Sequence, residues 1–376
     1  MFPWLYDTLF QAEWPWSMLR LFRYPFFCAM AAALSAFLIC VLATPLFARA
    51  LRRAGFWERT RHFSLLAVPA KRHVPTMGGA VIVGAVIASI LLWCRLGDAQ
   101  VWLLCGVAAF LAAVGCADDV RKIARGRGLS RTAKYAAAFA VAGAVTAFVC
   151  TPAVSPFQTA ELRWAFFVPC VKEGIAAGAL LVPFLVLFLV YSVNAVNITD
   201  GMDGLAAVPV IFAGAVLGIM AYVLAVPEYV RYLFFFPSHA GGHTIYQTLP
   251  SMNIAVAAAA LCGAMAGFLW HNAYPATIIM GDTGALAVGG MLGTIAVLLK
   301  QEALFLLAGG VFLLETAASW AQDSVGIGIF GRRLFCRAPL HDALLLKGTG
   351  ESKVTIRLWL LSALLAILAL ITLKVR

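Results

Sequence analysis

The sequence predicts an all-α protein that crosses a membrane about ten times. Two features of its composition support this class: 63% of the 376 residues are hydrophobic, and only 12% are charged. Soluble domains are about half apolar and a quarter charged. The third observation is the recurrence of long apolar runs, because about 20 such residues are enough for an α-helix to cross a bilayer.

Ten runs are apolar enough to form these spans. In chain order they are 25–48, 78–94, 101–117, 133–150, 175–193, 206–226, 252–270, 284–299, 303–325 and 354–373. The first is not a cleavable signal peptide, because it is too long and follows residues rich in Trp and Phe. We expect one integral-membrane domain over residues 1–376.

Basic residues predict the orientation of these spans. The loops 49–77, 118–134 and 326–357 hold most of the lysines and arginines. The positive-inside rule therefore places these three loops in the cytoplasm. With ten spans, both termini then lie on the outer side. Topology and affinity for anionic headgroups and phosphates explain the net charge of +11, so nucleic-acid binding is not indicated.

A polar stretch at 194–204 separates two of the apolar runs and carries two amides, two carboxylates and two glycines. Ionisable groups at a membrane edge are costly, so they indicate a functional site. Asn194 and Asn197 are three residues apart, as are Asp200 and Asp203, so each pair shares a face on a helical turn. The simpler alternative is a polar turn with the glycines as helix breakers.

Asp118 and Asp119 follow the run 101–117 directly. Adjacent carboxylates can share a divalent cation, or one can bind metal while the other accepts a proton. The macrodipole disfavours acids at a helix C-terminus, which argues for function. The alternative is a helix end whose acids pair with nearby arginines.

Three more polar clusters fall at the predicted cytoplasmic face. Gly281 and Gly284 bracket Asp282 and allow close backbone approach of a phosphate, although Asp282 also suits a helix N-cap. The segment 71–79 joins two cations to a Gly pair at a helix start, which suits phosphate binding or a plain membrane anchor. His341 could contact a phosphate, a sugar hydroxyl or a metal, or be merely solvated.

These clusters share one predicted face, so we expect their side chains to converge on one site. Mg²⁺ usually takes one or two carboxylates plus substrate phosphates, and basic side chains hold the rest of the anion. The reaction class indicated is phosphoryl transfer between a soluble cytoplasmic phosphate ester and a molecule in the bilayer. The converging acids are Asp118, Asp119, Asp200, Asp203 and Asp282.

At these motifs the chain resembles the phospho-N-acetylmuramoyl-pentapeptide transferase family, within the polyprenyl-phosphate N-acetylhexosamine-1-phosphate transferase superfamily. The resemblance implies a homodimer in the bacterial inner membrane with its active site at the cytoplasmic face. It implies Mg²⁺-dependent reaction of UDP-N-acetylmuramoyl-pentapeptide with undecaprenyl phosphate, giving UMP and lipid I for peptidoglycan synthesis. The matching segments are 71–79, 118–119, 194–204, 272–284, Glu315, 337–341 and the C-terminal Leu-Lys-Val-Arg.

The resemblance also implies residue roles. Asp118 and Asp119 match the family's catalytic acidic pair, Asp282 matches a catalytic magnesium ligand, and Asn194 matches the metal side of the cleft. We expect direct attack of the lipid phosphate on the sugar-linked phosphorus, with a covalent aspartyl-phosphate route as the alternative. The residues expected to bind substrate are Lys71, Thr76, Lys134, Asn197, Asp200, Asp203, Asn272, Gln322 and His341.

The chain departs from the family pattern at several positions. Where the family has three histidines, an aromatic residue and Glu, residues 341–345 read His-Asp-Ala-Leu-Leu. Ile279 replaces the phenylalanine expected to stack on uracil, His271 replaces an aromatic residue, and Ala285 replaces a serine. Because the acids are intact, we expect phosphoryl transfer to persist with altered nucleotide contacts.

Two other functions fit part of the pattern. Within the superfamily, the chain could transfer N-acetylglucosamine phosphate. A membrane transporter could also carry acids in broken helices, but transporter sites lie near the bilayer midplane and often recur in two halves. Here the acids cluster at one face and no repeat is evident.

Overall fold

The structure is a computed structural model that describes residues 1–10, 16–57, 74–157, 159–171, 174–226, 229 and 251–373. Within these ranges the only sheet is an antiparallel pair, β1 (Ala165–Phe166) and β2 (Ile175–Ala176). The predicted all-α class is therefore confirmed. The helical elements are α1 (Phe2–Leu9), η1 (Trp16–Arg23), α2 (Pro25–Arg53), α3 (Gly79–Trp93), α4 (Ala99–Arg125), α5 (Arg131–Cys150), α6 (Ala160–Trp164), η3 (Gly178–Leu180), α7 (Leu181–Thr199), α8 (Ala207–Ala225), α10 (Ser251–Asn272), α11 (Gly281–Leu298), α12 (Glu302–Ala308), α13 (Gly310–Trp320), η5 (Ala321–Ile327), α14 (Leu340–Leu346) and α15 (Glu351–Ile371).

Eight helices in the described part of the chain are long and apolar enough to cross a membrane: α2, α4, α5, α7, α8, α10, α11 and α15. The predicted run 303–325 corresponds to two helical segments, α12 and α13 with η5, which meet at an angle of 84°. Gly309 separates them with a non-helical backbone. The run 78–94 corresponds to α3, a shorter apolar helix. Each of the ten predicted runs thus has a helical counterpart.

Helix α11 lies at the centre of the bundle and is buried from Asp282 to Leu298. Its glycines permit this position, because small residues let membrane helices approach closely. A Cβ at Gly289 or Gly293 would overlap Ser192 of α7, and one at Gly290 would overlap Leu111 of α4. The Ser192 hydroxyl also donates a hydrogen bond of 2.7 Å to the Gly289 carbonyl. Helix α11 is therefore held between α4 and α7.

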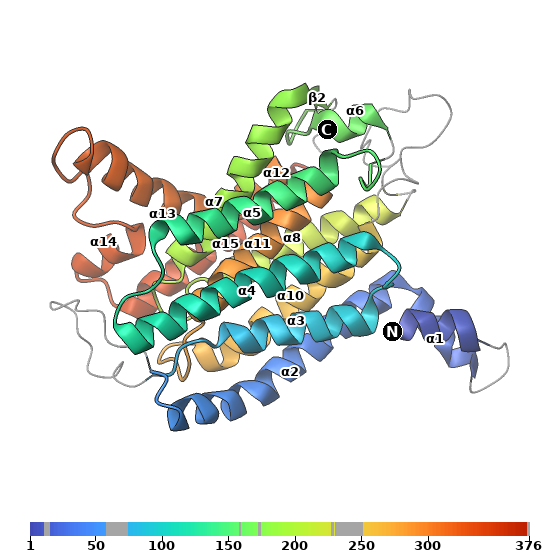
Figure 1. Ribbon diagram of the computed structural model, residues 1–376, viewed down its shortest axis with the longest axis horizontal. Coiled ribbons are helices and arrows are strands. Elements are labelled where there is room, and N and C mark those ends of the chain that lie inside the picture. The colour runs from blue at the N-terminus through green and yellow to red at the C-terminus, as the bar shows by residue number, and fades with distance from the viewer. Residues whose placement is uncertain are drawn as a thin grey trace.

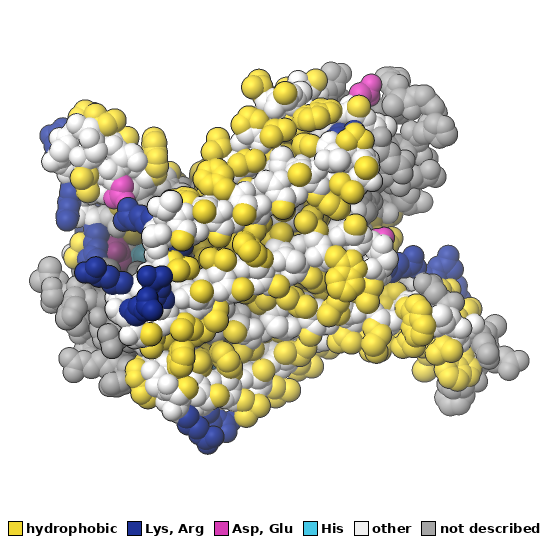
Figure 2. Space-filling model, viewed as in Figure 1, with side chains coloured by type: hydrophobic (Ala, Val, Ile, Leu, Met, Phe, Trp, Pro, Cys, Tyr) yellow, Lys and Arg dark blue, Asp and Glu magenta, His cyan; other side chains and the backbone are white. Residues whose placement is uncertain are grey.

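The outer helices follow chain order around this centre. Figure 1 shows α2, α3, α4 and α5 in succession across the bundle, each in contact with the next. Helix α10 packs closely on α2, because Gly263 faces the Ala33 backbone and Gly267 faces the Phe37 backbone. The sides of the molecule expose hydrophobic side chains, and Lys and Arg gather at its ends (Figure 2). This distribution fits a helix bundle embedded in a bilayer.

The two ends of the bundle differ in what they hold. The amino group of Met1 donates to the Leu91 and Leu92 carbonyls at the end of α3, whereas the start of α3 packs against Gly284 of α11. Helix α15 begins where Glu351 accepts a hydrogen bond from the Asp203 amide, and it runs towards the opposite end. Both ends of the described chain therefore lie away from the polar loops (Figure 1).

Candidate active site

Three carboxylates from two helices meet at the polar end of the bundle. Asp118 and Asp119 lie near the end of α4, and Asp282 lies in the first turn of α11. One oxygen from each lies within 4.8 Å of the other two, and all three residues are buried. We call these residues the acid triad. Neither Asp200 nor Asp203 belongs to it, so only three of the five acids expected to converge meet at this point.

The position of Asp282 depends on Asp119. One Asp119 oxygen accepts hydrogen bonds from the Thr283 amide at 3.0 Å and the Thr283 hydroxyl at 2.8 Å, and the other accepts from the Asp282 amide at 3.3 Å. The first N–H groups of a helix lack partners within it, and negative charge is favourable there. No residue at the start of α11 provides a side-chain cap. Asp119 therefore caps α11 from a neighbouring helix.

Two glycines allow this contact. A Cβ at Gly115, one turn before Asp119, would overlap the backbone of α11 at Asp282. Gly281 has a φ of +73°, a conformation that strains other residues. Thr76 lies against the same turn, since a Cβ at Gly281 would meet its hydroxyl. The predicted substrate-binding residue Thr76 thus lies next to the acid triad.

Two lysines neutralise much of the triad's charge. Lys122 Nζ is 2.6 Å from Asp118 Oδ2, 2.9 Å from Asp282 Oδ1 and 3.7 Å from Asp119 Oδ1. Lys134 Nζ is 2.9 Å from the same Asp118 oxygen and also bonds Asp282 Oδ2. The sequence analysis expected Lys134 at the site but placed Lys122 only in a basic loop. Its spacing of four residues from Asp118 and three from Asp119 is the signal that would have identified it.

The loop between α4 and α5 closes over Asp118. Helix α4 ends at Gly126 in the left-handed conformation, and the Leu129 amide then donates a hydrogen bond of 2.6 Å to Asp118 Oδ1. The Ser130 hydroxyl caps α5 by accepting from the Ala133 amide. This cap starts α5 beside the triad and brings Lys134, in its first turn, within reach of the carboxylates.

Two predicted substrate-binding residues instead hold loop backbones together. Asn272 Oδ1 accepts from the Gly204 amide at 3.0 Å, and Asn272 Nδ2 donates to the Ile278 carbonyl at 2.9 Å. Asp203 Oδ2 accepts from the Ala276 amide at 3.1 Å. These bonds join the loop after α7 to the loop before α11, so both residues have clear structural partners. Their expected contacts with substrate stay predictions.

His341 joins the site through α14. Its ring lies against the loop after α7, because a Cβ at Gly201 would overlap it. Glu315, fully buried on α13, accepts hydrogen bonds from the amides of Leu340 and His341 at 2.7 and 3.2 Å, and its Oε2 is 3.2 Å from His341 Nδ1. Glu315 therefore holds both the start of α14 and the His341 ring. Asp342, which stands in the family's histidine run, forms an ion pair with Arg337 at 3.0 Å.

The other predicted residues lie farther from the triad in their contacts. Gln322 Oε1 accepts from the amides of Leu334 and Phe335, each at 3.0 Å, and so anchors the loop after η5. Asn194 Nδ2 donates to the Val190 carbonyl of its own helix. The remaining three sites have no such role described here: Asn197 is half-buried on α7, Asp200 ends that helix, and Lys71 lies outside the described residues.

Comparison with known proteins agrees with this arrangement. The model of glycosyl transferase family 4 matches residues 101–300, which include the whole triad. The chain is 38% identical over 366 residues to the phospho-N-acetylmuramoyl-pentapeptide-transferase of Solidesulfovibrio magneticus, covering 96% of each protein. The protein of that name from Ruegeria pomeroyi is 38% identical over 365 residues, covering 95% of this chain and 96% of the relative. This similarity spans nearly the full length, so the chain belongs to the phospho-N-acetylmuramoyl-pentapeptide-transferase family.

Proposed function

We propose that the protein transfers phospho-N-acetylmuramoyl-pentapeptide from its UDP derivative to undecaprenyl phosphate. The products are lipid I and UMP, in the membrane stage of peptidoglycan synthesis. One observation carries the proposal: a chain that matches this transferase family nearly end to end also brings three acids and two lysines together at one end of a membrane bundle. Separate acids on separate helices meet there only because the chain folds as it does.

The side chains of the triad suit a magnesium ion. All three residues offer carboxylate oxygens, which are the ligands that Mg²⁺ prefers. Asp282 and Asp118 are the proposed ligands, since both oxygens of Asp119 already cap α11. When bound, Mg²⁺ would offset charge on the diphosphate and the leaving UMP. The expected ligand Asn194 keeps its amide oxygen available, and its role stays a prediction.

The lysines are the groups that can change partners in this site. Lys122 and Lys134 are bound to Asp118 and Asp282, the same residues that a cation would use. A cation on those carboxylates would compete with both ammonium groups and leave them able to hold phosphate oxygens. Charge-assisted contacts of this kind stabilise the transition state of phosphoryl transfer, which depends mainly on positioning and electrostatics.

The proposed reaction needs no strong base. A phosphate monoester is largely dianionic at neutral pH, because its second pKa is about 6. A phosphate oxygen of the acceptor lipid attacks the sugar-linked phosphorus, and the bond to the UMP oxygen breaks. Asp118 then acts by orienting Lys122 and Lys134, and Asp119 acts by positioning Asp282. Both roles follow from the partners that the carboxylates have in the fold.

The deciding experiment uses the purified full-length chain in detergent with undecaprenyl phosphate. UDP-N-acetylmuramoyl-pentapeptide and UDP-N-acetylglucosamine are offered separately, with Mg²⁺ or with EDTA, and the lipid product and UMP are measured. We expect product only from the muramoyl-pentapeptide donor, and only with Mg²⁺. Product from UDP-N-acetylglucosamine alone would place the protein in the other branch of the superfamily. Absence of product and of UMP exchange with either donor would refute a transferase function.

A further inference from the structure

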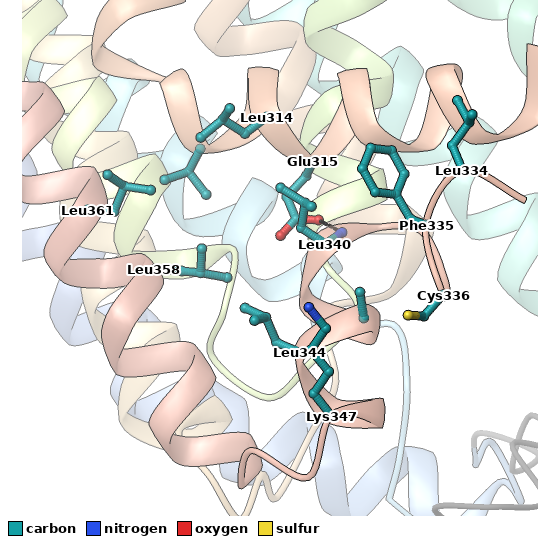
Figure 3. Close-up of a pocket in the computed structure, with 12 residues that line it drawn as sticks. Leu314, Glu315, Leu334, Phe335, Cys336, Leu340, Leu344, Lys347, Leu358 and Leu361 are labelled. Carbon is teal, nitrogen blue, oxygen red and sulfur yellow. Dashed lines mark hydrogen bonds between the residues drawn. The ribbon is translucent and has the colours of Figure 1, made fainter. Parts of the chain in front are cut away.

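A cavity separate from the acid triad lies between α13, α14 and α15. Its volume is about 440 Å³, within the range of roughly 300–1,000 Å³ typical of ligand pockets. Its walls are mainly leucine and phenylalanine side chains (Figure 3). None of its lining residues belongs to the triad or is one of the two lysines that bind it. Among the lining residues are Leu314, Phe335, Leu344, Leu358 and Leu361.

Two charged side chains line this cavity, and only one of them lacks a partner. The Glu315 carboxylate is engaged by α14, as described above. Lys347, at the end of α14, points its ammonium group towards the cavity (Figure 3). Within the described part of the chain, Lys347 forms no ion pair. The cavity is therefore an apolar space with a single unpaired positive charge at one side.

The surroundings of the cavity are those of a membrane surface. Leu314, Leu334 and Phe335, which line it, are 46%, 42% and 39% exposed on the outside of the bundle. Helix α14 lies at the polar end of the bundle, since its His341 contacts the loop after α7. Arg357 is exposed on α15, one turn before the lining residue Leu361. Apolar walls thus meet basic side chains at the level of the predicted inner-leaflet headgroups.

We propose that this cavity binds an anionic phospholipid of the inner leaflet, such as phosphatidylglycerol, with an acyl chain among the leucines and its phosphate on Lys347. Basic pockets between membrane helices on the cytoplasmic side attract anionic headgroups, and an apolar cavity beside lipid accommodates a chain. The phosphate of the acceptor lipid must instead reach the acid triad. Helix α14 lies between this cavity and His341, so an acceptor bound here would be on the wrong side of that helix.

Occupancy has a structural consequence for the site. Leu340, Ala343, Leu344 and Lys347 line the cavity from α14, so this face of the helix has no protein packed on it there. The opposite face presents His341 to the loop after α7. A bound lipid chain therefore braces the helix that carries His341.

The test is native mass spectrometry of the full-length chain in detergent, mixed with phosphatidylglycerol, phosphatidylcholine and undecaprenyl phosphate. We compare the wild type with Lys347→Gln, and use Lys353→Gln as control, because Lys353 is exposed and does not line the cavity. The wild type and the control should retain phosphatidylglycerol. Lys347→Gln should retain about fivefold less, as expected for one basic contact near a membrane. Leu361→Trp, which fills the cavity without changing charge, should also lower retention, with melting temperatures measured to confirm folding.

Several results would overturn the proposal. Equal phosphatidylglycerol retention by Lys347→Gln and the wild type would remove Lys347 from the site. An equal loss in Lys353→Gln would show general electrostatic attraction, and equal retention of phosphatidylcholine would exclude headgroup selection. Undecaprenyl phosphate held in a Lys347-dependent manner would make the cavity an acceptor site instead. No nucleotide sugar is present, so these outcomes are independent of the proposed transfer reaction.

Discussion

The adjacent residues Asp118 and Asp119 have different partners although they are chemically identical. Asp118 accepts from the Leu129 amide and binds Lys122 and Lys134. Asp119 directs both oxygens to the first turn of α11. Successive positions on a helix are about 100° apart, so adjacent side chains face different neighbours. The sequence indicates that the pair is functional, but the division of roles depends on the helices that surround it.

Asp282→Asn tests the third carboxylate. Asparagine keeps the shape of the side chain but removes the charge that binds Lys122, Lys134 and the proposed cation. We expect turnover to fall by about 10²- to 10³-fold, the range found when a group that stabilises a transition state is removed. The melting temperature should stay close to that of the wild type. Undiminished turnover would remove Asp282 from the proposed metal site.

The residues that depart from the family pattern show what a local change leaves intact. His341 keeps a buried position on Glu315, although the next two residues are Asp342 and Ala343. Asp342 has a new partner in Arg337. The loss of the neighbouring histidines therefore changes the surface of α14 without displacing its first residues. The effect of this change on nucleotide binding stays a prediction.

At the scale of elements, α11 shows how a helix start becomes part of a site. Its first N–H groups receive their acceptor from α4, and its glycines bring it close to both α4 and α7. The sequence analysis considered Asp282 as the N-cap of its own helix. In the structure Asp282 lies in the first turn, and Asp119 supplies the cap. A cap from another helix has no signature in the local sequence, because its spacing is not short.

Asp119→Ala tests this cap. Its removal leaves the buried amides of Asp282 and Thr283 without their acceptor, which costs about 1–3 kcal/mol for an unsatisfied buried group. We expect a lower melting temperature together with lower turnover, since Asp282 loses its position. Thr283→Val, the control, removes only the hydroxyl contact and should cost about 1 kcal/mol. A melting temperature unchanged by Asp119→Ala would contradict the capping role.

The polar loops form another element that sequence reasoning describes only in part. The stretch 194–204 was expected to bind substrate, and its place beside His341 fits that expectation. Yet Asp203 and Asn272 also bind backbone groups of the adjoining loops. Hydrogen-bonding side chains serve scaffold and substrate with the same atoms, so residue type alone does not separate these uses.

At the scale of the whole molecule, close helix contacts hold the triad together. Gly289→Ala would place a Cβ against the Ser192 backbone of α7. We expect a loss of about 1–3 kcal/mol from overpacking, seen as a lower melting temperature. Gly143→Ala on α5 is the control, because a Cβ there meets nothing within 4 Å. It should be neutral or slightly stabilising, since alanine favours a helix more than glycine does. Equal effects of the two substitutions would show that α11 is not tightly packed.

The whole-molecule predictions differ in how far they are tested. The all-α class and the apolar spans are confirmed, and the family is shown by the relatives. The single domain, the homodimer and the cytoplasmic position of the site stay predictions. The placement of the triad at the end opposite the chain ends is what the predicted topology requires.

The sequence by itself determined the fold class, the order of the spans, the end of the bundle that holds the acids, and the family. These features depend on hydropathy, charge and motifs, which are local properties of the chain. Only the tertiary structure decided which acids meet, that Lys122 joins them, and that Asp119 caps α11. It also decided that Asp203 and Asn272 join two loops. These contacts depend on distances between helices, which are set by the packing of small residues far apart in the chain.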